Sequence, residues 1–312
     1  MQAYRARPFL IDQLIRPVKT GRIVHARIFS GPAGTGKKTA AEWSARAINC
    51  EATGERPCNV CPSCLRFLSG NAPELIRLSP DAESSFIKVD AIRALIDVLS
   101  VKPDRGYKCV IISPADRMND AAQNALLKTL EEAPPYAVFF LITESLSRLL
   151  PTIRSRCAVM RFAPLSTDEV YTYLIGEGIN ESEAREAAAF SGGCIGKALD
   201  RINNPAYKDT GALLTACFQK YSCIADAAAI SAEIGKLKDK SRIVLSILEA
   251  SAHELMNGGE LSALSKALSK NGIDGARLMR AVINCAQSLE HFVTFQYAID
   301  MLLYEIIPTE ES

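Results

Sequence analysis

Four cysteines in one short segment are the residues of this chain best suited to binding a metal ion. Cys58, Cys61 and Cys64 follow the spacing C-x2-C-x2-C, and Cys50 lies eight residues before Cys58. Four thiolates can complete a tetrahedral Zn²⁺ site and leave no position for water, which makes such a site structural. The alternatives are an iron–sulfur cluster, although the fourth ferredoxin cysteine follows the run, and four unliganded thiols. These ligand rules favour a structural zinc module over residues 50–64.

A glycine-rich segment is the second candidate site. Residues 31–37 read Gly-Pro-Ala-Gly-Thr-Gly-Lys, which matches the pattern G-x-x-x-x-G-K between a β-rich run and a helical run. In that context glycines let backbone N–H groups face an anion at a helix N-terminus, and the lysine adds charge for the β and γ phosphates. The segment therefore predicts a nucleotide-binding loop rather than a plain turn. Its candidate nucleotide-binding residues are Gly31, Gly34, Thr35, Gly36, Lys37, Lys38 and Thr39.

Two parts of a complete Mg²⁺–ATP site are missing. The position after the motif lysine, where a Ser or Thr hydroxyl coordinates Mg²⁺, is Lys38, and Thr39 follows one residue late, about 100° further round a helix. The run 108–112 continues into Ser113-Pro114, where a P-loop ATPase carries Asp and often Glu. Asp116 lies too far on and is most simply a turn or cap residue. We therefore expect binding of ATP or ADP with poor Mg²⁺ coordination and little hydrolysis.

The elements that must position these residues follow an alternating pattern up to about residue 165. This alternation predicts an α/β domain with a parallel sheet over residues 1–164. After Pro164 the strand signals stop, which predicts a small helical unit over 165–207 and a helical domain over 208–312. The expected strands are 26–30, 75–78, 108–112 and 137–142, and the expected helices of the first domain include 89–100 and 119–132, the latter capped by Asn119.

Charge and hydropathy argue against two classes of protein, stand-alone nucleic-acid binders and membrane proteins. The 312 residues carry 36 Lys and Arg against 35 Asp and Glu, a net charge of +1, which argues against a stand-alone nucleic-acid binder. No apolar run is long enough to span a membrane and the first residues are charged, so we expect a cytoplasmic protein without membrane contact. A solvated face or a subunit contact explains the basic residues of the first 30 positions as well as a modest DNA contact does. These residues are Arg5, Arg7, Arg16, Lys19, Arg22 and Arg27. The remaining cysteines predict buried free thiols: Cys109, Cys157, Cys194, Cys217, Cys223 and Cys285.

Several motifs in a fixed order resemble the bacterial clamp-loader AAA+ family. Residues 116–134 resemble the helix that follows the second nucleotide motif of that family, and 150–157 contain its Ser-Arg-Cys signature. With the glycine-rich loop, the cysteine module and residues 192–199, the resemblance covers about 20–205. It implies an AAA+ P-loop domain, a helical lid and a C-terminal helical collar that holds a hetero-pentamer together.

The resemblance also implies roles for single residues. Arg156 would be an arginine finger, presented in trans to ATP bound on a neighbouring subunit. The alternative is an exposed arginine that forms an ordinary surface ion pair. Thr143 would sense the γ-phosphate, or be an ordinary strand-end threonine. Lys197 occupies the position of a second sensor, which is usually arginine in active members.

The Ser113-Pro114 pair resembles the delta-prime branch of the family more than the ATP-hydrolysing gamma/tau branch. This implies gamma/tau and delta subunits as partners, with the sliding clamp and primer–template DNA reached through the complex during DNA replication by DNA polymerase III. One alternative is a gamma/tau-like ATPase in which Asp116 serves Mg²⁺. Another is a P-loop nucleoside monophosphate kinase with a zinc lid, although its cysteine pairs usually lie far from the loop.

Overall fold

The structure, a computed structural model, describes residues 13–306 with gaps at 15, 19, 82–84, 221–225, 259–261 and 291–292. The chain divides into two compact units, residues 1–164 and 165–312. The predicted thiol Cys223 and three basic N-terminal residues, Arg5, Arg7 and Lys19, lie outside the described residues. No helix among the described residues is both long enough and apolar enough to cross a membrane.

The first unit is built on a five-stranded parallel sheet with strand order β2-β3-β4-β1-β5. The strands are β1 (Ala26–Ser30), β2 (Leu75–Leu78), β3 (Lys108–Ile112), β4 (Ala137–Thr143) and β5 (Ala158–Arg161). The four expected strands are confirmed. The edge strand β5 was not expected, because it is short and largely exposed and so lacks the apolar run of a buried strand.

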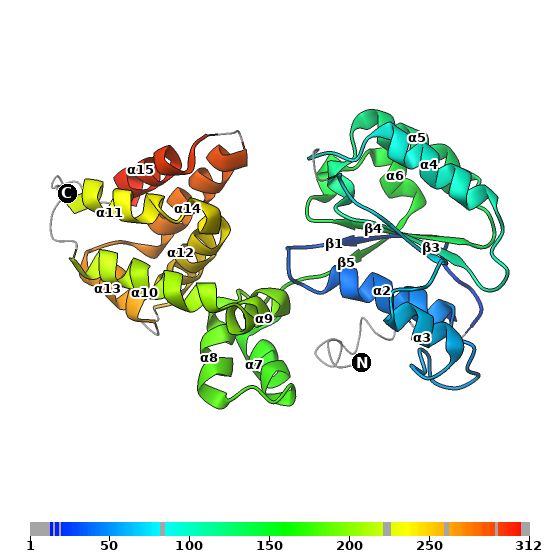
Figure 1. Cartoon of the computed structure of the whole chain (residues 1–312), viewed down its shortest axis with the longest axis horizontal. Helices are drawn as coiled ribbons and strands as arrows, with labels where there is room; N and C mark the ends of the chain where they lie inside the picture. The colour runs from blue at the N-terminus through cyan, green and yellow to red at the C-terminus, as the bar shows by residue number, and fades with distance from the viewer. Residues whose placement is uncertain are drawn as a thin grey trace. The chain divides into compact units, whose positions relative to one another are not determined.

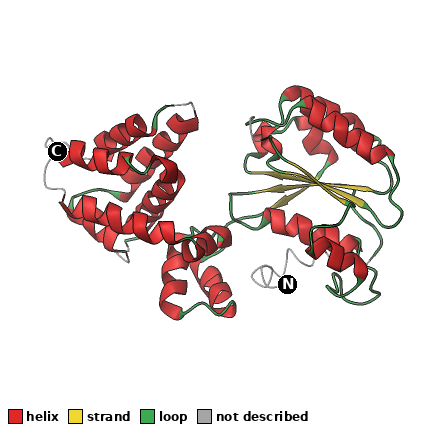
Figure 2. Ribbon diagram, viewed as in Figure 1, coloured by secondary structure: helices red, strands yellow, loops and turns green. Residues whose placement is uncertain are grey.

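Helices cover both faces of this sheet (Figures 1 and 2). Alternate residues of β3 and β4 point to opposite faces: Ile111 and Phe140 pack with residues of α2, and Val110 and Phe139 pack with residues of α4 and α5. The helices are α2 (Lys37–Ile48) and α3 (Pro62–Leu68) on one side, and α4 (Val89–Ser100), α5 (Asp120–Glu131) and α6 (Pro151–Arg156) on the other. Burial on both sides explains the continuous apolar strands.

The predicted cap of the long helix in the first unit is present. The Asn119 side chain accepts a hydrogen bond from the Ala122 amide at 2.9 Å, and the helix begins at the next residue, Asp120. Pro134-Pro135 follow its last turn, where proline cannot continue a helix.

The second unit is entirely helical in its described residues, as expected (Figure 2). Its core is formed by apolar side chains from Phe190 to Ile306. The α-helices are α7 (Thr167–Gly176), α8 (Glu181–Phe190), α9 (Ile195–Asn203), α10 (Pro205–Lys220), α11 (Asp226–Gly235), α12 (Ser241–Met256), α13 (Ala263–Lys270), α14 (Gly275–Glu290) and α15 (Phe295–Ile306).

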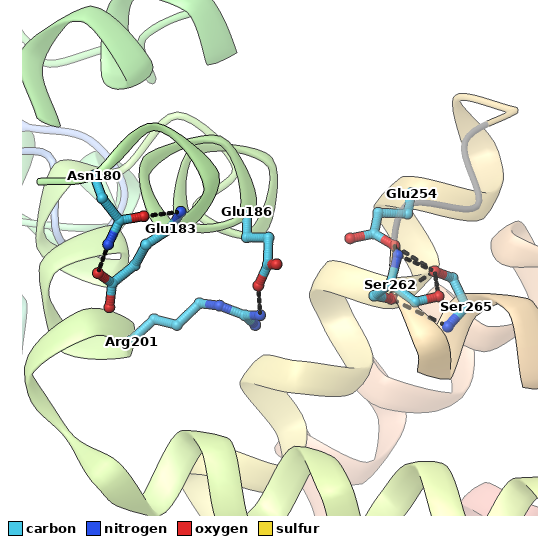
Figure 3. A network of polar contacts seen from close by, with 7 residues as sticks. All are labelled: Asn180, Glu183, Glu186, Arg201, Glu254, Ser262 and Ser265. Atoms are coloured by element: carbon cyan, nitrogen blue, oxygen red, sulfur yellow. Dashed lines mark hydrogen bonds and ion pairs between the residues drawn. The ribbon is translucent and has the colours of Figure 1, made fainter. Parts of the chain in front are cut away.

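Polar side chains define where two of these helices, α8 and α13, begin (Figure 3). Asn180 caps α8 by accepting the Glu183 amide at 2.9 Å. Before α13, the Glu254 carboxylate of α12 accepts bonds from the hydroxyls of Ser262 and Ser265, so the cap is tied to a neighbouring helix. Each cap satisfies amides that a helix N-terminus leaves without intrahelical partners.

Together these elements confirm the general form of the predicted fold: an α/β domain with a parallel sheet and flanking helices, followed by an all-α region. The sheet order places β3, β4 and β1 side by side, with the glycine-rich segment directly between β1 and α2. The boundary between a lid and a collar within the second unit stays a prediction.

Candidate nucleotide and metal sites

The glycine-rich segment forms a loop that only glycine can form at its first position. Gly31 has φ 154°, and a Cβ there would lie 2.2 Å from the carbonyl oxygen of Phe162. Its amide donates to the Thr143 carbonyl at 3.2 Å, which ties the loop to the end of β4. Gly34 and Gly36 have φ values of 76° and 85°, in the left-handed region that favours glycine. The loop therefore leads into the N-terminus of α2, as an anion-binding loop does.

The motif lysine lies inside this loop. The Lys37 ammonium donates to the carbonyls of Gly31 and Pro32, both at 2.6 Å, and the residue is only 6% exposed. Thr35 is also buried, and its hydroxyl donates to Pro32 at 2.8 Å. A bound phosphate would have to compete with these carbonyls for the ammonium.

The two residues after the lysine are both exposed on the first turn of α2. Lys38 stands where a metal-binding hydroxyl is expected, and Thr39 lies one helical step further on. An ammonium repels a divalent cation rather than coordinating it. The local chemistry thus suits phosphate better than Mg²⁺.

The candidate sensor Thr143 and the displaced carboxylate Asp116 are brought together at the carboxyl edge of the sheet. The hydroxyl of Thr143, which is fully buried, donates to Asp116 Oδ1 at 2.7 Å. The same oxygen accepts the Glu144 amide at 3.2 Å. Asp116 lies in the short helix η2 (Ala115–Arg117) after the cis Ser113–Pro114 bond. Its carboxylate therefore joins the end of β3 to the end of β4, one strand away from the loop after β1.

Arg156 is the last residue of α6 and forms an ion pair within its own unit. Its Nη2 lies 2.5 Å from Glu131 Oε1, and its Nη1 donates to the Thr152 carbonyl at 3.0 Å. The side chain is 37% exposed. The guanidinium is thus held by the Glu131 carboxylate and the Thr152 carbonyl, and it is also partly open to solvent.

Lys197, at the start of α9, is paired within the second unit. Its ammonium lies 2.8 Å from Glu249 Oε2 of α12, and the two side chains are 30% and 38% exposed. The pair links α9 to the long helix α12. The Lys197 ammonium, which is predicted to sense nucleotide, is therefore paired with the Glu249 carboxylate in this structure.

The four cysteines of the predicted metal module converge. The sulfur atoms of Cys50, Cys58, Cys61 and Cys64 all lie within 4.8 Å of one another. A tetrahedral Zn²⁺ with Zn–S bonds of about 2.3 Å holds its sulfurs about 3.8 Å apart, so the arrangement fits a four-thiolate metal site with little adjustment. This cluster could hold a metal ion.

Backbone amides in the cysteine module are directed at the sulfurs. The amides of Cys58, Cys61 and Cys64 donate to the sulfur of the preceding cysteine in the set at 3.3–3.4 Å. Hydrogen bonds from Val60 and Cys61 lower the pKa of Cys58 to about 6, whereas burial raises the pKa of Cys64 to about 12. Loading a metal would therefore release a proton from the buried Cys64 thiol.

The described cysteines outside the module are all buried, which confirms their expected place in the core. Burial raises the pKa of Cys157, in the Ser-Arg-Cys signature, to about 12, so it stays a neutral thiol. These residues are Cys109, Cys157, Cys194, Cys217 and Cys285.

Sequence analysis missed one buried polar residue next to the site. Gln123 is 2% exposed, donates to the carbonyls of Met118 and Arg148 at 3.1 and 3.2 Å, and accepts the Leu150 amide at 2.8 Å. Leu150 is the N-cap of α6, so this amide fixes the helix that ends in Arg156. The signal was a glutamine within the apolar stripe of α5, three residues before Leu126.

A pocket of about 390 Å³ lies at the opposite edge of the sheet. It is lined by residues that precede strands, among them His25, Tyr107 and Pro135, and by Glu131 at the end of α5. It is therefore separate from the nucleotide loop, which follows the carboxyl end of β1.

Comparison of the sequence with known proteins identifies the family of this chain. The sequence model described as "DNA polymerase III, delta subunit" matches residues 6–166, about half of the chain. The chain is 35% identical over 206 residues to DNA polymerase III subunit delta' of Bacillus subtilis, covering 66% of this chain and 62% of that protein. Subunit delta' of Escherichia coli is 34% identical over 191 residues, covering 60% and 57%.

A differently named relative matches over a longer stretch. Subunit tau of Escherichia coli is 32% identical over 273 residues, covering 86% of this chain and 40% of that protein. The chain thus spans between 40% and 62% of the length of these three relatives. Because the family model matches about half of the chain, including the glycine-rich loop, the cysteine module and Arg156, the chain belongs to the DNA polymerase III delta subunit family.

Proposed function

We propose that this chain is a delta-prime-like subunit of the DNA polymerase III clamp loader and that it helps to load the sliding clamp on primed DNA. In this role it supplies Arg156 as an arginine finger to ATP on a neighbouring subunit, while its own ATPase site is degenerate. The observation that carries the proposal is the contrast between two places. Arg156 is half-exposed at a helix end, whereas Ser113-Pro114 replace the carboxylates of a hydrolytic site.

The chain's own nucleotide site supports binding without turnover. The glycine-rich loop and Lys37 provide amides and a positive charge for the phosphates of ATP or ADP. Hydrolysis also needs a carboxylate for Mg²⁺ and one for water. Asp116, the carboxylate nearest in sequence, is engaged by Thr143 and Glu144. We therefore expect poor Mg²⁺ binding here.

The cysteine module would hold a structural Zn²⁺. Four sulfurs within 4.8 Å of one another leave no ligand position for substrate water. When bound, the ion would cross-link the loop after α2 to α3. Its contribution would be to the stability of the module.

The partners follow from the family. They would be gamma/tau and delta subunits in a hetero-pentamer assembled in the cytoplasm, with the clamp and primer–template DNA reached through that complex. The lid (165–207) and collar (208–312) would serve nucleotide response and assembly. Membership of a DNA polymerase III family argues against the monophosphate kinase alternative.

Removal of the finger tests the proposal. The purified chain is combined with an ATP-hydrolysing partner subunit, delta, clamp and primed DNA, and the steady-state ATPase rate is measured. Arg156→Ala should lower the stimulated rate about tenfold or more, because trans-acting fingers contribute strongly to phosphoryl transfer.

A matched control is available in the same unit. Arg77 forms an exposed ion pair with Glu42 at 3.0 Å and is 44% exposed, close to the exposure of Arg156. Arg77→Ala should leave the rate near wild type. An unchanged rate with Arg156→Ala, in a complex that still assembles, would contradict the proposed function.

A further inference from the structure

The guanidinium of Arg156 is anchored from two different helices. Glu131 Oε1, at the end of α5, lies 2.5 Å from Nη2. The Thr152 carbonyl and the Ser155 hydroxyl of α6 accept from Nη1 at 3.0 and 3.4 Å. A guanidinium has five N–H donors, so these three acceptors leave donors for another anion. These contacts hold the guanidinium in place and leave some of its N–H donors for a further acceptor.

The local electrostatics make this pairing more favourable for both residues. Each is the last residue of its helix, and helices α5 and α6 pack against each other. The C-terminus of a helix disfavours a carboxylate and favours a cation. Glu131 therefore stands at an unfavourable helix end unless a cation lies beside it, and Arg156 supplies that cation. The Nη2–Oε1 distance of 2.5 Å is that of a direct ion pair.

We propose that Glu131 is a positioning residue for Arg156: it orders the guanidinium at the ends of α5 and α6 before a neighbour's ATP approaches. The inference rests on the proposed trans role of Arg156. A long arginine side chain loses rotamer freedom when it engages phosphate, and ordering it beforehand removes part of that cost. Glu131 itself does not touch the nucleotide in this mechanism.

Paired substitutions separate positioning from charge. Glu131→Ala removes the acceptor and should lower the maximal stimulated ATPase rate about threefold to tenfold, with little change in the ATP concentration giving half the maximal rate. Glu131→Gln keeps an oxygen at the same place and should restore most of the rate. The magnitude corresponds to immobilising one arginine side chain.

A control variant and a double variant test whether Glu131 acts specifically through Arg156. Glu42→Ala breaks the comparable Arg77 pair and should leave the rate unchanged. The double variant Glu131→Ala/Arg156→Ala should match Arg156→Ala alone, because Glu131 acts only through Arg156. Circular-dichroism melting of each variant verifies that the α/β unit is folded.

The outcomes distinguish the two proposals. If Arg156→Ala leaves the stimulated ATPase rate unchanged, the proposed trans role of Arg156 is itself wrong. If Arg156→Ala lowers the stimulated ATPase rate but the rate of Glu131→Ala equals or exceeds that of wild type, the trans role of Arg156 is supported. The positioning role of Glu131 is then overturned. A Glu131→Gln rate as low as that of Glu131→Ala would also overturn it, since the hydrogen-bond acceptor would then not suffice.

Discussion

At the scale of single residues, the same side-chain types serve in different ways according to burial. Lys37 lies within its loop on backbone carbonyls, whereas Lys38 beside it is exposed. Cys64 is fully buried and has a raised pKa, whereas Cys58 is half-buried with a pKa lowered to about 6 by backbone amides. Such differences arise because burial disfavours charge and hydrogen-bond donors favour it.

Substitution of a proposed metal ligand tests the cysteine module. Cys61→Ser should reduce the zinc content of the purified protein from one ion per chain to a small fraction, because three thiolates do not close a tetrahedral site. Elemental analysis measures the content, and a melting curve with and without chelator reports the stability that the ion provides.

A buried cysteine outside the module is the matched control. Cys217→Ala should lower the free energy of unfolding by about 1 kcal/mol, a typical value for one substitution, without changing the zinc content. Full zinc content in Cys61→Ser would contradict the ligand assignment, and an iron-containing coloured protein would favour the cluster alternative.

At the scale of elements, the ends of helices and strands carry the chemistry. The ends of β1, β3 and β4 bring the glycine-rich loop, Asp116 and Thr143 to one edge of the sheet. The ends of α5 and α6 bring Glu131 to Arg156. Gln123 connects these elements, since its amide bonds both the turn before α5 and the N-cap of α6.

Truncation of Gln123 tests how firmly α6 is held. Gln123→Ala would leave the Leu150 amide and two carbonyls without this partner, so the free energy of unfolding should fall by about 1–3 kcal/mol. Urea denaturation measures the change. Asn124→Ala, on the exposed face of the same helix, should stay within about 0.5 kcal/mol of wild type. Equal stability of the two variants would show that the buried amide contributes little.

At the scale of the whole molecule, the chain consists of two units with separate cores. The core of the second unit runs from Phe190 to Ile306, and the first unit has one core on each face of its sheet. The candidate site residues lie in the first unit, apart from Lys197. Under the proposed function the helical unit serves assembly, and the chain acts as a partner to an ATPase rather than as one.

ATP binding by the isolated chain tests that proposal. A fluorescent ATP analogue should bind with an affinity that Mg²⁺ does not change, and no Mg²⁺-dependent turnover should be detected, because Lys38 and Ser113-Pro114 replace metal-binding groups. Lys37→Ala should weaken binding about tenfold or more, and the exposed Lys102→Ala should not. Measurable hydrolysis abolished by Lys37→Ala would instead favour the gamma/tau-like alternative.

Much of the fold could be predicted from local patterns. Strands 26–30, 75–78 and 108–112 and helix 89–100 were predicted at their observed bounds, because continuous apolar runs and a 3.6-residue period report burial directly. The edge strand β5 was missed because an exposed strand carries no such run. Gln123 was missed because a single polar residue in an apolar stripe does not reveal its partners.

The sequence by itself determined the candidate chemistry: the cysteine spacing, the glycine-rich loop, the missing Mg²⁺ ligands and the Ser-Arg-Cys segment all depend on residue type and local spacing. Only the tertiary structure decided which groups meet. Asp116 with Thr143, Lys197 with Glu249 and Arg156 with Glu131 are each separated by 25 or more residues. Their pairing depends on how strands align and helices pack, and these contacts are not encoded in any one segment.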